Sequence, residues 1–255
     1  MTDSSTAAIP GLGLAPSFHT PLFVPDYPPM QGDGWVVQRG GMVLSRGYWS
    51  GLWLVEGLAA LVRLEPEGPR SWMSITPMEL ESQEIGIAAA CGHTVVMGLG
   101  MGWAAANTAL NPRVGRVTVV ERDPAVIALE REIGVFRQLP PDAAAKLTVV
   151  EGDALTWRGA ADFLMPDIWR PLNGPGREEE VRRMVENTGA AGVYFWGQEM
   201  ELARRARTLG QSLEEPKAAI ALHAIAADWR LPLAGPGLSG YAGKVAAAAR
   251  QWLRD

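Results

Sequence analysis

The stretch from residue 93 to residue 123 constrains the fold of this chain most strongly, because two short apolar runs flank a glycine-rich turn. Residues 94–97 and 116–120 are rich in β-branched side chains, as buried parallel strands are. A helical segment, residues 103–110, lies between them, and Glu121 follows the second run. This order predicts a strand, turn, helix and strand of an α/β fold.

The turn itself, residues 98–102 with the sequence GLGMG, suits a backbone that approaches a ligand. Glycine allows close approach, and the following helix presents unpaired N–H groups and the positive end of its dipole. Glu121 lies 23 positions after Gly98, where a carboxylate can accept hydrogen bonds from both hydroxyls of a ribose. The pattern therefore predicts a site for a nucleoside-containing ligand.

The glycine spacing separates two classes of nucleoside ligand. Dinucleotide-binding folds use G-x-G-x-x-G, whose last glycine lets the helix pack closely on the strand. Here the spacing is G-x-G-x-G, and Trp103 stands where that last glycine would fall. The G-x-G-x-G form with an acidic residue after the second strand resembles the class I S-adenosylmethionine-dependent methyltransferases. Residues 147–153, LTVVEGD, resemble the third strand of that family and its aspartate.

The resemblance implies S-adenosylmethionine as the cofactor, bound along the ends of the first three strands. Glu121 would hold the ribose hydroxyls and Asp153 the adenine amino group. Met97 stands where many members carry an acidic residue before the first glycine. The cofactor-binding residues implied in this part of the chain are Gly98, Leu99, Gly100, Met101, Gly102, Glu121, Arg122, Asp153 and Ala154.

A helix predicted before the glycine strand narrows the resemblance to one branch of the family. Thr76 and Pro77 suit a helix start, and Glu79 completes a capping box with Thr76. A small β-rich segment, a helix and the glycine strand follow one another in the same order in the spermidine synthase branch. In that branch the helix carries a glutamate and other polar groups near the cofactor, and Glu79 and Gln83 are the matching positions here.

Asp167 ends the predicted fourth strand, residues 162–167, at the edge of the sheet where ligands of open α/β folds bind. In aminopropyltransferases of that branch, a catalytic aspartate at this position helps to deprotonate an amine, and a second acid follows it. This chain continues with Ile168, Trp169 and Arg170, so the second acid is absent. We therefore expect methyl transfer to a small molecule or peptide, with Asp167 as the catalytic base.

Three alternatives to a methyltransferase remain open. The first is an aminopropyltransferase that uses decarboxylated S-adenosylmethionine. The second is a nicotinamide enzyme, which would need room where Trp103 stands. The third is a non-catalytic subunit that binds a cofactor or a protein partner.

The chain divides into three predicted parts. Residues 1–34 are rich in Pro, Gly and Ser and show no sustained periodicity, which predicts a flexible tail that packs on the surface or covers a ligand cleft. Residues 35–75 contain short apolar runs broken by glycines, which predict a small antiparallel β-rich segment. Residues 76–255 are predicted to form the Rossmann-like domain, with a doubly wound, mostly parallel sheet.

Further elements are predicted along that domain. Residues 191–196 form a predicted fifth strand, and residues 125–133, 177–187 and 198–209 form predicted helices. Asp123 and Pro124 suit the start of the first of these helices. The region from residue 212 onward reads as helical, without the final antiparallel hairpin that the common class I fold has.

Composition excludes several other classes. A net charge of -5 without runs of Lys or Arg argues against a nucleic-acid partner. A single cysteine rules out internal disulfides, and no His, Asp and Glu spacing indicates a metal site. Residues 86–110 carry no charge, but their five glycines fit a helix end, a strand and a helix start better than a membrane span. With no signal peptide evident at the N-terminus, we expect a cytoplasmic protein that does not bind membranes, with a homodimer as its candidate assembly.

Overall fold

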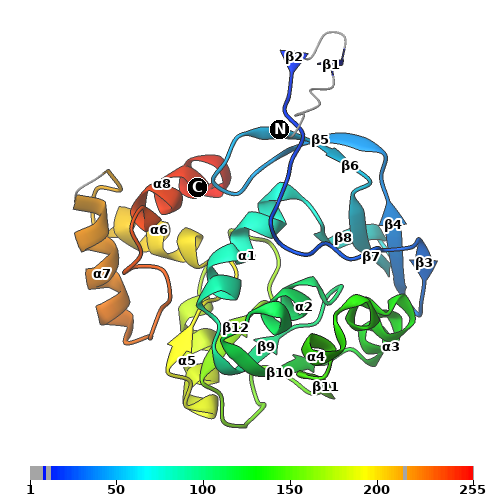
Figure 1. Cartoon of the computed structure of the whole chain (residues 1–255). Helices are drawn as coiled ribbons and strands as arrows, with labels where there is room; N and C mark the ends of the chain where they lie inside the picture. The colour runs from blue at the N-terminus through cyan, green and yellow to red at the C-terminus, as the bar shows by residue number, and fades with distance from the viewer. Residues whose placement is uncertain (1–7, 10–12, 215–216, 255) are drawn as a thin grey trace.

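A five-stranded parallel sheet forms the centre of the computed structural model, which describes residues 8–9, 13–214 and 217–254 (Figure 1). The strands lie in the order β11–β10–β9–β12–β13, and neighbouring strands are parallel throughout. This order confirms the predicted doubly wound, Rossmann-like sheet. The strand bounds are Gly92–Met97 for β9, Val114–Glu121 for β10, Leu147–Glu151 for β11, Phe163–Pro166 for β12 and Gly192–Val193 for β13.

The strand β9 lies in the middle of the sheet because it is apolar on both faces. Val95, Val96 and Met97 are all buried, as expected for a parallel strand covered on both sides. Val96 is paired with Val119 of β10 on one side and with Met165 of β12 on the other. The chain order reverses between β9 and β12, and open α/β sheets bind ligands at the carboxyl ends beside such a reversal.

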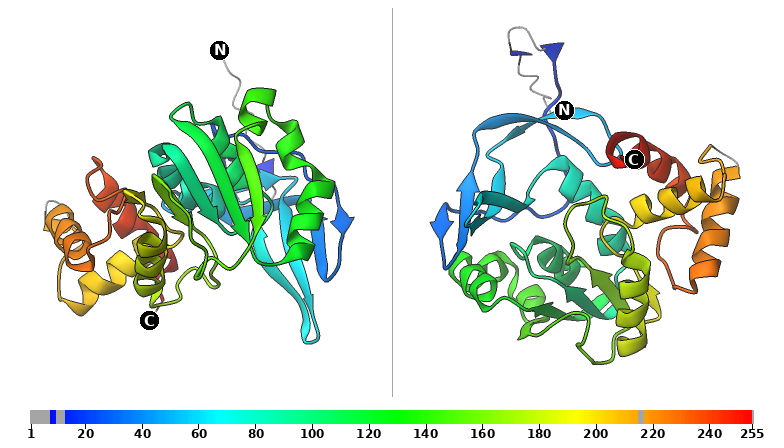
Figure 2. Two further views of the ribbon diagram at one scale, coloured as in Figure 1. Left: turned by 90° about the horizontal axis from the view of Figure 1, so that it is seen from below. Right: turned by 180° about the vertical axis from the view of Figure 1, so that it is seen from behind.

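Helices cover the sheet on both faces, and in Figure 2 it lies between α3 on one side and α5 on the other. Oγ1 of Thr76 caps α1 by accepting a hydrogen bond from the Glu79 N–H at 3.4 Å. Oδ1 of Asp123 caps α3 by accepting one from the Ala125 N–H at 2.9 Å. Both caps lie where the sequence predicted them. The bounds are Pro77–Ala89 for α1, Trp103–Leu110 for α2, Pro124–Ile133 for α3, Val135–Gln138 for the 3-10 turn η1, Pro141–Ala144 for α4 and Arg177–Thr188 for α5.

The N-terminal part of the chain forms antiparallel strands that pack against the parallel domain (Figure 1). The backbone of Gly32 lies against Leu129 of α3, and Sδ of Met73 in β8 accepts a hydrogen bond from the Met101 N–H at 3.2 Å. The β8 strand is thereby docked on the glycine turn. The bounds are Ala8–Ile9 for β1, Gly13–Leu14 for β2, Met30–Gln31 for β3, Trp35–Arg39 for β4, Met42–Arg46 for β5, Leu52–Glu56 for β6, Ala59–Glu65 for β7 and Gly68–Ser74 for β8.

The described part of the predicted tail is anchored on α2. The carbonyl oxygen of Phe23 accepts hydrogen bonds from Nε1 of Trp103 at 2.8 Å and Nδ2 of Asn107 at 2.9 Å. The N–H of Phe23 donates to Oδ1 of Asn107 at 2.9 Å. The flexible tail predicted over residues 1–34 is therefore held, around Phe23, by two side chains of α2, Trp103 and Asn107; residues 1–7 and 10–12 lie outside the described residues.

The predicted fifth strand is shorter than its apolar run. The strand β13 covers only Gly192–Val193, although the N–H groups of Tyr194 and Trp196 still donate to the carbonyl oxygens of Leu164 and Pro166 in β12, at 3.0 and 2.9 Å. Residues 232–234 extend this edge, where Val193 N–H donates to Pro232 O at 2.9 Å and Ala234 N–H donates to Val193 O at 2.8 Å. Across the described residues, helices stand in place of a final hairpin, and none of them is long and apolar enough to cross a bilayer. They are α6 (Gln198–Thr208), α7 (Lys217–Trp229) and α8 (Tyr241–Trp252).

Candidate functional site

A pocket opens at the carboxyl ends of the parallel strands, beside the reversal between β9 and β12. Its empty space is about 1150 Å³ with the part open to solvent included, which is ample for a small-molecule ligand. Met101 and Gly102 lie outside its lining; the Met101 side chain is buried, and Gly102 precedes the first turn of α2. The predicted site residues that do line the pocket are Glu79, Gln83, Gly98, Leu99, Gly100, Glu121, Arg122, Asp153, Ala154 and Asp167.

The glycine turn needs glycine at its first two glycine positions for different reasons. Gly98 has a φ of +102°, and a Cβ there would clash with the backbone carbonyl oxygen of Asp167. Gly100 has a φ of +51°, and a Cβ there would clash with Sδ of Met73. The missing side chain of Gly98 lets the end of β12 lie beside the turn, and the missing side chain of Gly100 lets β8 pack on it.

The carboxylate of Glu121 is fixed at the tip of β10. Its Oε2 accepts a hydrogen bond from the Leu99 N–H at 2.9 Å, and its Oε1 accepts one from the Asp123 N–H at 2.9 Å. Each carboxylate oxygen can accept a second hydrogen bond. Glu121 therefore retains acceptor capacity on the pocket side while its orientation is set by the backbone.

The far end of the pocket lies beside the ends of β10 and β11. Oδ1 of Asp153 accepts a hydrogen bond from the Leu155 N–H at 2.8 Å, which orients the carboxylate in its loop. Ala154, Leu155 and Val126 supply apolar surface next to it. A carboxylate beside apolar side chains suits a purine ring with an exocyclic amino group.

Two carboxyl groups meet at the other end of the pocket. Oδ2 of Asp167 accepts a hydrogen bond from Nε2 of Gln83 at 2.8 Å. Burial raises the pKa of Asp167 to about 7, although Arg177 and the Gln83 hydrogen bond act in the opposite direction. Burial, and then the charge of Asp167, raise the pKa of Glu79 well above its usual range. Asp167 can therefore exchange a proton near neutral pH, which is what a general base requires.

A buried arginine holds the aromatic wall next to Asp167. The Arg177 guanidinium lies 5.3 Å from the ring centroids of both Trp169 and Trp196, and its Nη1 donates to the Trp196 carbonyl oxygen at 2.7 Å. Both tryptophans line the pocket. Because cation–π contacts and hydrogen bonds act on the same group, the position of this wall depends on Arg177.

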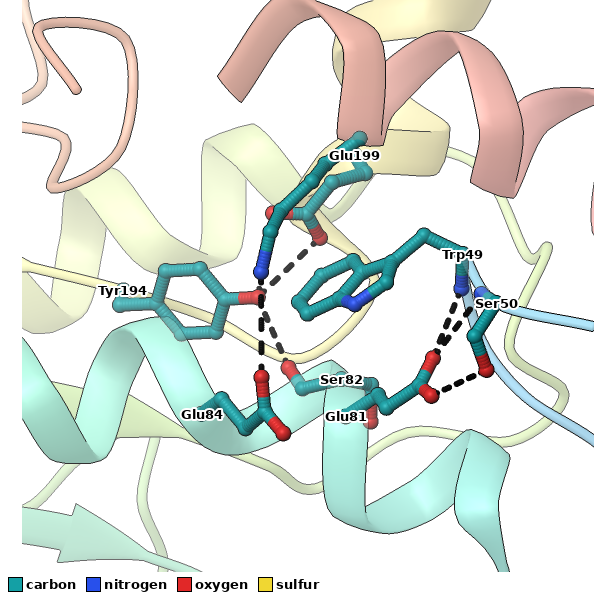
Figure 3. A network of polar contacts seen from close by, with 8 residues as sticks. Trp49, Ser50, Glu81, Ser82, Glu84, Tyr194 and Glu199 are labelled. Atoms are coloured by element: carbon teal, nitrogen blue, oxygen red, sulfur yellow. Dashed lines mark hydrogen bonds and ion pairs between the residues drawn. The ribbon is translucent and has the colours of Figure 1, made fainter. Parts of the chain in front are cut away.

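A polar network behind that wall ties α1 to the N-terminal hairpin and to α6 (Figure 3). Nε1 of Trp196 donates to Oγ of Ser82 at 2.9 Å. The Tyr194 hydroxyl lies 2.7 Å from the Ser82 carbonyl oxygen and 3.1 Å from a carboxylate oxygen of Glu199. Oε2 of Glu81 accepts the Trp49 N–H at 3.0 Å. Because α1 also carries Glu79 and Gln83, this network fixes the helix that supplies the acidic end of the pocket.

The pocket residues that come from the N-terminal sheet were not predicted from the sequence. Trp35, Arg63, Trp72 and Met73 all line the pocket. Trp35 and Trp72 meet edge to face with centroids 5.3 Å apart, and Nε1 of Trp35 donates to Oδ2 of Asp123 at 3.1 Å. The antiparallel sheet is thus one wall of the site. The chain has 10 tryptophans, but their number does not say which of them line a pocket.

No metal centre accompanies the pocket in the part of the chain that the structure describes: no group of three or more His, Cys, Asp or Glu side chains there could hold an ion. The acidic residues of the pocket are instead spread along it, from Asp153 at one end to Glu79 and Asp167 at the other.

Comparison with known proteins gives partial structural similarity only. No family model and no curated protein matches the sequence. A glycopeptide N-methyltransferase, MtfA, solved with S-adenosyl-L-methionine, is 18% identical with a TM-score of 0.34; the match covers 42% of this chain and 48% of that one. The methyltransferase domain of bacterial CtHen1-C is 15% identical with a TM-score of 0.35, over 46% and 65%.

A third solved structure is precorrin-6y C5,15-methyltransferase from Geobacter metallireducens, 18% identical with a TM-score of 0.32, over 45% of this chain and 59% of that one. The chain therefore covers less than two thirds of the length of each of these structures. Similarity at this level identifies no activity, substrate or partner for this chain.

Proposed function

We propose that this protein is an S-adenosylmethionine-dependent methyltransferase that acts on a small molecule or a peptide. The observation that carries the proposal is the state of the N–H groups in the glycine turn. Leu99 N–H donates to Glu121 and Met101 N–H donates to Met73. A dinucleotide needs such groups for its pyrophosphate, whereas a nucleoside with a sulfonium side chain does not.

The charge of the pocket supports the same choice. Among the described residues of its lining, four acidic residues besides Glu79 (Glu121, Asp123, Asp153 and Asp167) stand against two arginines (Arg63 and Arg122); burial, and then the charge of Asp167, raise the pKa of Glu79 well above its usual range, so Glu79 adds little charge. A pyrophosphate would meet repulsion along this surface, and a cationic sulfonium would be attracted to it. Trp103, buried at the start of α2, also occupies the space that a nicotinamide dinucleotide fold keeps clear.

The residues of the pocket fit the parts of this cofactor in order. Asp153 with its apolar neighbours would take the adenine, Glu121 the ribose hydroxyls, and the backbone of Gly98 and Gly100 would lie beside the methionine part. Glu79 and Gln83 reach that end from α1 and could take the role of the acidic residue that Met97 replaces. The spermidine synthase branch remains a prediction, based on the order of the β-rich segment, the helix and the glycine strand, with these two positions as its match.

Asp167 would act on the methyl acceptor. When bound, S-adenosylmethionine supplies a methyl group that is already activated by the sulfonium, so the protein mainly has to align the reactants. Asp167 would accept the proton that an N–H or O–H nucleophile loses, and Gln83 would hold its carboxylate in place through the 2.8 Å hydrogen bond. The acceptor, a homodimer and a cytoplasmic location remain predictions.

Substitution of Glu121 by alanine tests the cofactor site. We expect Glu121→Ala to weaken the binding of S-adenosylmethionine and S-adenosylhomocysteine by about a hundredfold, because two hydrogen bonds to a charged acceptor would be lost. Calorimetric titration measures the effect. Glu151→Ala is the matched control, since Glu151 pairs with Glu121 in the strand register but lies outside the pocket lining.

The same titration separates the alternatives. Preference for decarboxylated S-adenosylmethionine would favour the aminopropyltransferase, and binding of NAD would favour a nicotinamide enzyme. If the unaltered chain binds none of these ligands, the methyltransferase proposal fails. A non-catalytic subunit would bind a cofactor without producing S-adenosylhomocysteine in the presence of any acceptor.

A further inference from the structure

A patch of arginines lies against the pocket wall that Trp35 and Trp72 form. Arg170 follows Asp167 by three positions, on the same loop. Its guanidinium stacks on Trp72 with 4.1 Å between the Cζ atom and the ring centroid, and Trp72 lines the pocket. The loop that carries Asp167 therefore also carries a cation fixed against the pocket wall.

The guanidinium of Arg170 is held in place but keeps unused hydrogen-bonding capacity. Nη1 donates to the carbonyl oxygen of Ser71 at 3.0 Å. Nη2 lies 3.7 Å from Oε1 of Glu65, a charge contact beyond hydrogen-bonding distance. Nε is buried and has no hydrogen-bond partner within the described part of the chain. A planar donor group in this state is suited to an oxyanion, which can accept two parallel hydrogen bonds.

Two further arginines surround this group. Arg70 pairs with Glu65 at 3.2 Å, so one carboxylate is shared between Arg70 and Arg170. Arg63 stacks on Trp35 at 5.2 Å and forms no ion pair among the described residues. Burial, and then the charges of Arg70 and Arg63, lower the pKa of Arg170, with Glu65 opposing them. The patch is locally positive in a chain whose net charge is -5.

We propose that this arginine patch, composed of Arg63, Arg70 and Arg170, binds an oxyanion of the methyl acceptor, either a carboxylate or a phosphate. This inference rests on the proposed function and names the class of its substrate. The anion would take the place of Glu65 beside Arg170, and the nucleophilic N–H or O–H of the same molecule would reach Asp167. The acceptor is therefore a small acid that carries a nucleophile at its other end.

Binding of simple anions tests the patch without knowledge of the acceptor. Malonate and inorganic phosphate would be titrated against the full chain, with tryptophan fluorescence as the readout because Trp72 stacks on Arg170. Chloride at equal ionic strength is the reference, and the titrations are repeated with S-adenosylhomocysteine present. We expect at least one of the two anions to bind, and the tighter one indicates whether the acceptor carries a carboxylate or a phosphate.

Paired variants make the test specific. We expect Arg170→Gln to weaken anion binding by about tenfold, as the loss of a charged hydrogen bond implies, and Arg183→Gln, an exposed site on α5, to leave it unchanged. Glu65→Gln should tighten binding, because it removes the competing carboxylate. Glu67→Gln, an exposed neighbour in the same hairpin, should not. Arg63→Gln is a second variant in case Arg170→Gln unfolds.

The outcomes are distinguishable from those of the cofactor test. The anion site is ruled out if malonate and phosphate act no differently from chloride, or if both Arg170→Gln and Arg63→Gln bind them as the unaltered chain does. Anion binding that survives while S-adenosylhomocysteine fails to bind would overturn the methyltransferase proposal and leave the anion site standing. If S-adenosylhomocysteine binds but malonate and phosphate do not, the anion site is ruled out and the methyltransferase proposal stands.

Discussion

Gly98→Ala is expected to lower the melting temperature of this protein by about 6–12 °C and to abolish ligand binding. The left-handed conformation at this position, with φ of +102°, costs an L-residue roughly 1–2 kcal/mol. The new methyl group would also meet the backbone carbonyl of Asp167, which can move only by shifting β12. A total cost of about 3 kcal/mol corresponds to this change in melting temperature for a domain of this size.

The effect on function should exceed the effect on stability. The close contact between Gly98 and the Asp167 backbone sets the distance between the glycine turn and the carboxyl end of β12. Separating them displaces the two ends of the proposed site from each other, and small displacements of reacting groups reduce rates severely. Calorimetric unfolding and titration with S-adenosylhomocysteine would measure both effects.

Gly115→Ala is the matched control for this substitution. Gly115 lies in β10, has no positive φ, and the nearest atom to an added Cβ is the Gly92 carbonyl oxygen at 4.0 Å. We expect unchanged ligand binding and a shift in melting temperature within about 2 °C. Equal behaviour of the two variants would show that Gly98 is not under steric constraint and would contradict the described contact between the turn and β12.

The parallel core could be predicted from the sequence because its information is local. The β-branched runs of β9 and β10 and the capping residues Thr76 and Asp123 each specify a neighbouring piece of backbone. The glycine turn and Glu121 after the next strand also lie, as predicted, at the strand ends that line the pocket. These features depend on the order of residues along the chain and not on its tertiary packing.

The rest of the site depends on contacts between distant segments. Trp35 and Trp72 reach the pocket because β4 and β8 dock on α3 and the glycine turn. Met73 accepts a hydrogen bond from the Met101 N–H, although the two residues are 28 positions apart in the sequence. Arg177, the first residue of α5, is buried, although it opens a predicted helix of charged, amphipathic sequence. The assigned fifth strand ends at Val193, but the backbone of Tyr194 and Trp196 still hydrogen-bonds to β12, while the side chains of these two residues bond to Glu199 of α6 and Ser82 of α1. The hydrophobic periodicity of the sequence does not show which distant segments are in contact.

Asp167→Asn is expected to reduce the rate of methyl transfer by about 10² to 10⁴, the usual contribution of a general base. The amide keeps the size of the side chain and the oxygen that accepts from Gln83, so binding of S-adenosylhomocysteine should stay unchanged. The acceptor for the assay would come from a screen of small acids with N–H or O–H groups, with formation of S-adenosylhomocysteine as the readout. Asp142→Asn, an exposed site in α4, is the control.

The pH dependence follows from the pKa of Asp167, which is raised to about 7. Only the carboxylate form can accept a proton, so kcat/KM of the unaltered chain should rise with pH through about 7 and then level off. Burial, and then the charge of Asp167, raise the pKa of Glu79 well above its usual range, so Glu79 carries no charge while Asp167 ionises, and Glu79→Gln should leave this midpoint in place. A profile that is flat between pH 5.5 and about 8.5 would exclude Asp167 as the base.

The same group should make the protein less stable as pH rises. Its folded pKa lies above the unfolded value of 3.8, so the stabilisation is complete below about pH 4 and is lost as pH rises through about 7. Because asparagine cannot ionise, the Asp167→Asn variant does not lose this stability as pH rises. We therefore expect Asp167→Asn to be more stable than the unaltered chain by roughly 2 kcal/mol at pH 8, and by less at pH 5. Thermal unfolding at the two pH values measures this difference in stability. If Asp167→Asn is inactive but gains no stability at pH 8, the Asp167 carboxylate is already solvated, and burial does not raise its pKa for catalysis.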